Sequence, residues 1–92
     1  MDLYIGNLCK QAMDTDLKKA FSAFGNVMSA HIVTDSYTRR SRGFAFVKME
    51  DRISGERAIL KLDRAIFMTQ TLIVREASNK ESLQLSGGFN KV

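Results

Sequence analysis

Two phenylalanines occupy alternate positions of an apolar stretch that is typical of a β-strand. Phe44 and Phe46 lie within residues 43–49 (GFAFVKM) and are separated by a single alanine. Because successive side chains of a strand point to opposite faces of a sheet, both rings belong to the same face. Flat rings that face solvent can stack on other planar groups, including nucleic-acid bases.

The same alternation decides which face of this strand is buried. With the two rings in water, the residues that face inward are Ala45, Val47 and Met49. The opposite assignment, in which the rings are ordinary core aromatics, would bury the charges of Arg42 and Lys48. Burial of an unpaired charge is strongly unfavourable, so we expect the rings to be exposed.

The first residues of the chain follow the same rule. In residues 3–5 (LYI), Leu3 and Ile5 face inward, and Tyr4 faces outward beside the small Gly6. Three exposed rings flanked by cations form a surface that can stack bases and bind a phosphate backbone. The flanking cations are Arg42, Lys48 and Arg75.

Two helical patterns separate the strands that must position these rings. The first helix is predicted to begin at an N-cap, Asp14, and to end before Gly25 in the left-handed conformation that often terminates helices. Its apolar residues recur with helical spacing and are Leu17, Ala20, Phe21 and Phe24. The second helix is predicted to be capped by Asp51, and Gly55 permits its close approach to a sheet. Its apolar residues are Ala58, Ile59 and Leu62.

The remaining predicted elements complete an alternating order of strands and helices. Residues 27–34 and 43–49 predict two strands joined by the polar loop 35–41, and residues 71–76 predict a last strand after a small hairpin at 66–70. The order β-α-β-β-α-β predicts a ferredoxin-like α+β sandwich. In this fold two helices cover one face of a four-stranded antiparallel sheet, and the other face stays open.

Length and composition limit the organisation of the chain. Its 92 residues, 45% hydrophobic and 26% charged, suffice for one globular core and one surface site. We expect one domain over residues 1–77 and a flexible, polar C-terminal tail over residues 78–92. The chain lacks the ~20 consecutive apolar residues of a membrane span and begins without a secretory signal pattern, so we expect a cytoplasmic protein.

The supply of reactive residues argues against catalysis. One cysteine, Cys9, and one histidine, His31, are too few for a metal site, and we expect no cofactor. A small phosphatase on this fold needs an arginine in an anion-binding loop, and residues 6–13 offer Asn7 and Lys10 but no arginine. The net charge of +4 instead favours a polyanionic partner.

Two short segments resemble the signature motifs of the RNA recognition motif family. Residues 3–8 (LYIGNL) are similar to its hexamer motif, and residues 42–49 (RGFAFVKM) are similar to its octamer motif. One helix and one strand separate them, as the family requires, and the resemblance extends over about residues 2–77. It is greatest with small single-domain members from bacteria.

The resemblance implies roles for particular residues. Tyr4 and Phe46 are expected to stack on bases, Phe44 to contact sugars, and Arg42 to pair with a phosphate. The full set of expected RNA-binding residues is Tyr4, Asn7, His31, Arg39, Arg40, Arg42, Phe44, Phe46, Lys48 and Arg75.

Several positions depart from the family pattern. Arg39, Arg64 and Thr69 stand where glycine is common, and Met49 replaces an aromatic at a position that faces the core. Val33 and Ile73 are apolar at positions of the open face where polar residues are usual.

The resemblance implies that the chain binds short single-stranded RNA without catalysis. The expected partner is single-stranded RNA, with single-stranded DNA as a second candidate, and no small-molecule substrate. We expect a monomer that works as an RNA chaperone or a post-transcriptional regulator. The alternative is a protein-interaction domain on the same scaffold, which would use the rings together with Val33 and Ile73 as an apolar patch.

Truncation tests the expected division between domain and tail. Removal of the residues after Asn79 should leave the melting temperature nearly unchanged and RNA affinity within about threefold, because a flexible polar tail adds few contacts. Melting curves and RNA titrations of both lengths measure this. A gain of tenfold or more would show that the tail covers the site, and a comparable loss would show that it contributes contacts.

Overall fold

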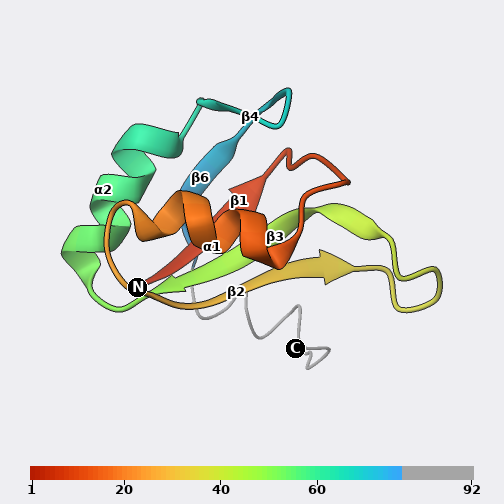
Figure 1. Cartoon of the computed structure of the whole chain (residues 1–92), viewed down its shortest axis with the longest axis horizontal. Helices are drawn as coiled ribbons and strands as arrows, with labels where there is room; N and C mark the ends of the chain where they lie inside the picture. The colour runs from red at the N-terminus through yellow and green to blue at the C-terminus, as the bar shows by residue number, and fades with distance from the viewer. Residues whose placement is uncertain (78–92) are drawn as a thin grey trace, which may run out of the picture.

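The computed structural model describes residues 1–77, so the predicted tail lies outside the described residues. Its elements are β1 (Asp2–Gly6), α1 (Asp14–Ser22), β2 (Val27–Thr34), β3 (Ser41–Met49), α2 (Arg52–Leu62), β4 (Ile66–Phe67), β5 (Gln70–Thr71) and β6 (Ile73–Glu76). Within residues 1–77, four strands form an antiparallel sheet in the order β2-β3-β1-β6, and the short strands β4 and β5 form a separate hairpin. In the described part of the chain, both helices cover one face of the sheet, and Figure 1 shows no helix of residues 1–77 on the opposite face. The predicted ferredoxin-like sandwich is confirmed.

The core lies between the sheet and the two helices. The inward residues of β1 and β3 are almost completely buried, as the alternation predicts, and they are Leu3, Ile5, Ala45, Val47 and Met49. Phe21 of α1 packs with them and has no exposed surface. No helix within residues 1–77 is long and apolar enough to cross a membrane.

The first helix begins one residue earlier than predicted. Its N-cap is Met13, whose amide donates to the carboxylate of Asp16 at 2.8 Å. Asp14 is therefore not the cap. Its carboxylate instead accepts the amide of Ile32 at 2.9 Å and joins α1 to β2, a contact between residues far apart in the sequence.

Gly25 was expected in the left-handed helical region, and this prediction is wrong. The helix ends at Ser22 with Ala23 as its C-cap, and Gly25 has a φ of 156°. A side chain here would collide with Ser54 of α2. Close packing between the end of α1 and α2 explains the glycine.

The start of the second helix agrees with the prediction. Asp51 is the N-cap of α2, and its carboxylate accepts the amide of Ser54 at 2.7 Å. This hydrogen bond lowers the pKa of Asp51 below its ordinary value. Gly55 also permits close approach, because a β-carbon on it would collide with the side chain of Met1.

The last strand is shorter than predicted. Thr71 belongs to the β4–β5 hairpin, and β6 begins only at Ile73. Between them, the buried Leu72 exchanges backbone hydrogen bonds of 2.8 Å with Ala65 and Arg64, which hold the hairpin beside the sheet. In contrast, β3 begins at Ser41, two residues earlier than predicted.

Left-handed backbone occurs at all three positions where this chain has a larger residue in place of the glycine common in the family. The φ angles are 65° at Arg39, 69° at Arg64 and 73° at Thr69. Met68, with a φ of 50°, precedes Thr69 in the two-residue turn between β4 and β5. Positive φ at both turn positions is typical of type I′ hairpins, which favour glycine at the second position. These residues are strained because a left-handed non-glycine residue costs roughly 1–2 kcal/mol.

The substitution Thr69→Gly tests this strain. It should raise the free energy of unfolding by about 0.5–1 kcal/mol, because relief of the left-handed backbone exceeds the entropy that glycine adds to the unfolded chain. Urea denaturation measures the change. Thr71→Gly in β5 is the matched control and should destabilise the protein, because this residue has ordinary backbone. A lower free energy of unfolding for Thr69→Gly would contradict the interpretation.

Candidate nucleic-acid interface

One row of side chains crosses all four strands of the sheet. Tyr4 of β1 pairs in register with Arg75 of β6 on one side and with Phe46 of β3 on the other. Phe46 in turn pairs with His31 of β2. Directly opposed residues of antiparallel strands point to the same face, so these four side chains lie together on the face opposite the helices.

Tyr4, Phe44 and Phe46 form a cluster that we call the aromatic platform. Ring centroids are 5.9 Å apart for Tyr4 and Phe44, 5.8 Å for Tyr4 and Phe46, and 6.3 Å for the two phenylalanines. The phenylalanine rings meet edge to face at 88°, a favourable aromatic geometry. The predicted outward orientation is confirmed. Each ring is half-buried, and each contacts the other two.

Gly6 positions the ring of Tyr4. A β-carbon built on this glycine would lie 2.8 Å from Cε2 of that ring, too close for a real contact. The ring therefore lies over the backbone of Gly6, in space that any other residue would fill. This steric restriction explains why glycine occupies this position of the hexamer motif.

Arg75 lies against the platform. Its Cζ atom is 4.6 Å from the centroid of the Tyr4 ring, within the range of a cation–π interaction. The sequence predicted Arg75 as a flanking cation for phosphate. The structure places its guanidinium over an aromatic face, where it can also stack on a base.

Asn7 and Arg42 line a second region at the end of β1. Together with Lys10, Gln11 and Gln70 they border a depression of about 500 Å³. The side-chain amide of Asn7 donates to the backbone carbonyl of Thr71 at 2.7 Å, and the backbone carbonyl of Asn7 accepts Gln70 Nε2 at 2.9 Å. Asn7 therefore links β1 to β5, a structural role that its position in the motif did not indicate.

Gly43 shapes the strand next to Arg42. Its φ is 84°, and its carbonyl accepts the amide of Leu8 at 2.8 Å. The register of β2 and β3 shifts between Ile32 and Thr34, so this part of β3 is irregular. The exposed Arg42 thus comes close to the β1–α1 loop.

The loop between β2 and β3 is organised by Asp35. Its carboxylate accepts the amides of Tyr37 at 2.8 Å and Thr38 at 2.9 Å, and these hydrogen bonds lower the pKa of Asp35. Its backbone exchanges hydrogen bonds with Arg39 and Arg40, both of which are exposed. The loop therefore holds both arginines close to the edge of the sheet.

Tyr37 is a further candidate, which the sequence motifs did not indicate. Its side chain lies in this loop and is 95% exposed. An aromatic residue next to several arginines in an otherwise polar loop was the available signal. An exposed ring at this place can stack on a base beyond the platform.

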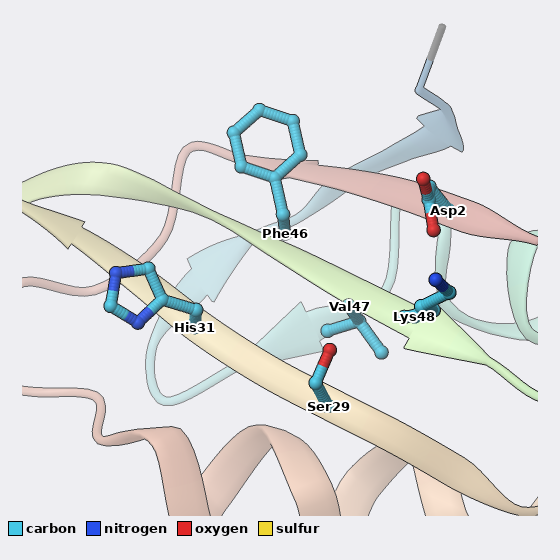
Figure 2. Close-up of a pocket in the computed structure, with 6 residues that line it drawn as sticks. All are labelled: Asp2, Ser29, His31, Phe46, Val47 and Lys48. Carbon is cyan, nitrogen blue, oxygen red and sulfur yellow. The ribbon is translucent and has the colours of Figure 1, made fainter. Parts of the chain in front are cut away.

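Lys48 and His31 border a third depression, of about 220 Å³, beside Phe46. Asp2 and Ser29 line it as well, and Figure 2 shows Phe46 projecting from β3 while His31 and Ser29 project from β2.

The structure brings seven of the ten expected RNA-binding residues to the open sheet face and its end. Arg39 and Arg40 lie in the β2–β3 loop, and the side chain of Asn7 is hydrogen-bonded to the backbone of β5. These ten residues remain candidates for RNA contact.

Comparison with known proteins identifies the family. The model of the RNA recognition motif matches residues 3–73. The chain belongs to this family. Membership confirms the predicted non-enzymatic binding domain.

Similar proteins support this assignment. RbpD of Nostoc sp. (strain PCC 7120), which carries the name of an RNA-binding protein, is 41% identical over 81 residues, which cover 88% of this chain and 86% of RbpD. The crystal structure of the RNA-binding protein PG1 has a TM-score of 0.82 at 44% identity, covering 84% of this chain and 93% of that one. A Sxl-lethal protein in complex with RNA has a TM-score of 0.79 at 35% identity, covering 83% of this chain and 47% of that one. The expected likeness to small bacterial members is confirmed by RbpD.

Separate variants of two phenylalanines test the assignment of the two faces. Phe46→Ala should weaken RNA binding by about 1–3 kcal/mol with little loss of stability, because its ring is on the open face. Phe21→Ala should lower the free energy of unfolding by about 3–5 kcal/mol, because its ring is fully buried. Denaturation and RNA titration of both variants measure this. If Phe46→Ala were as destabilising as Phe21→Ala, the platform would be part of the core.

Proposed function

We propose that this protein binds short single-stranded RNA on the open face of its sheet. The observation that supports this most directly is the row that runs from Arg75 through Tyr4 and Phe46 to His31 across all four strands. The row offers successive flat groups to which unpaired bases can stack. A base-paired duplex keeps its bases inside and cannot use such a surface, so the ligand is single-stranded.

The phosphate backbone is the second component of the proposed ligand. Arg42 lies at one end of the platform and Lys48 at the other, and both side chains are exposed. Arg39, Arg40 and Tyr37 extend the surface along the β2–β3 loop. Positive charge along the path of the strand attracts phosphate groups without regard to base sequence.

The expected affinity is modest. A stacked base contributes about 1–3 kcal/mol, and ordering a flexible strand opposes binding. Two stacks and a few phosphate contacts therefore lead to a dissociation constant in the micromolar range. Modest affinity suits an RNA chaperone or a post-transcriptional regulator, which must bind and release many RNAs.

Three further features belong to this proposal. Single-stranded DNA offers the same bases and phosphates and is expected to bind with comparable or lower affinity. The platform is contributed by a single chain, so a monomer suffices for binding. We place the activity in the cytoplasm, where the RNA of bacteria is found.

The salt dependence of RNA binding tests the role of Arg42. With about three phosphate contacts, the slope of log K against log salt should be near −2, and Arg42→Ala should flatten it by about 0.7. Titrations at several salt concentrations measure the slopes. Arg57→Ala on the exposed side of α2 is the control and should leave the slope unchanged. Binding that is insensitive to salt would contradict the proposal and would favour an apolar protein partner for the face that includes Ile73, which is 49% exposed.

A further inference from the structure

The depression beside Phe46 combines an aromatic ring with charges of both signs. Asp2 of β1 pairs in register with Lys48 of β3, and Lys48 lies opposite Ser29 of β2. These residues, together with His31, line the depression of about 220 Å³ that Figure 2 shows. A carboxylate thus flanks β3 on one side, and a hydroxyl and an imidazole flank it on the other.

Asp2 is exceptional among the aspartates of residues 1–77. The carboxylate of each of the others accepts a hydrogen bond from a backbone amide and so has a structural role. These aspartates are Asp14, Asp16, Asp35, Asp51 and Asp63. Within residues 1–77, the carboxylate of Asp2 makes no such bond, and the ion pairs there join Arg52 to Glu56 and to Glu76. The carboxylate of Asp2 and the ammonium of Lys48 are therefore both available to a ligand.

We propose that this depression selects guanine, an inference that rests on the proposed binding of single-stranded RNA. The base stacks on Phe46 with its Watson–Crick edge toward Asp2 and Lys48. The carboxylate of Asp2 accepts both N1–H and N2–H, and the ammonium of Lys48 donates to O6. Residues two apart on a strand are separated by about 7 Å, which a base lying over Phe46 can span.

Only guanine matches both charges of this site fully. It carries two neighbouring donors on its Watson–Crick edge beside an acceptor, and a carboxylate can accept two such donors at once. Uracil offers a single N–H donor to the carboxylate, and adenine and cytosine offer only their exocyclic amino group. A good two-point contact of this kind discriminates between bases by about fivefold to 150-fold.

Binding of short RNAs to the full 92-residue chain tests the selection. The probes are five-nucleotide RNAs of uridines with guanosine, inosine, adenosine, cytidine or uridine at the centre, titrated at one salt concentration. The guanosine probe should bind at least about tenfold more tightly than the all-uridine probe. Inosine lacks the N2 amino group and should lose a measurable part of this preference.

Asp2→Asn separates base selection from charge. An amide keeps the size of the side chain but cannot accept two hydrogen bonds in the same way, so the preference for guanosine should fall below about threefold. The difference between guanosine and inosine should also disappear in this variant. Glu56→Gln on the exposed side of α2 removes the same charge away from the sheet and should keep the full preference. Melting curves establish that both variants are folded.

The outcomes distinguish failure of the guanine site from failure of the proposed RNA binding. Equal binding of all five probes by the unmodified protein would overturn the guanine site and leave RNA binding intact. A guanosine preference that persists in Asp2→Asn would overturn the assignment to Asp2. Failure to bind any probe would overturn the proposed function and the guanine site together.

Discussion

Burial of alternate residues on two paired strands determines the surface of this protein. Leu3 and Ile5 of β1 pair in register with Val47 and Ala45 of β3, and all four side chains are almost completely buried against the helices. Because successive side chains alternate, the residues between them must face the other way. A shift of one residue would expose this core and bury the charge of Lys48 beside it. The packing that stabilises the fold therefore also places the rings in solvent.

The functional face is built from local contacts added to this constraint. The three rings meet one another at centroid distances of about 6 Å, Gly6 leaves room for Tyr4, and Arg75 lies over the same ring. Rings that support one another lose little freedom when a base stacks on them, which favours binding. Charged side chains occupy the ends and the adjacent loop, where a phosphate backbone leaves the platform. Except at Arg75, which lies over the Tyr4 ring, stacking and charge are thus separated in space, and they can be altered independently by substitution.

The sequence predicted those features that depend on local patterns. Alternation identified the buried and exposed faces of β1 and β3, and Asp51 was recognised as a cap because capping depends on residues within one turn. Predictions failed where a distant partner decides the outcome. The carboxylate of Asp14 accepts the amide of Ile32 in β2. Glycine is needed at position 25 because a side chain there would collide with Ser54 of α2. Asn7 reaches Thr71, 64 residues away, so its structural role was not apparent from the motif. Tyr37 was missed because the sequence does not show that the loop leaves its ring exposed.

The most direct measurement of the central claim is an NMR titration of isotope-labelled protein with a short single-stranded RNA, with duplex RNA as the comparison. If the open face is the binding surface, the largest shifts should occur at Tyr4, Phe44, Phe46 and their neighbours across the sheet. The exposed residues of α1 and α2 should change little, and duplex RNA should cause weaker effects. Shifts concentrated on the helices, or no shifts with any nucleic acid, would contradict the account.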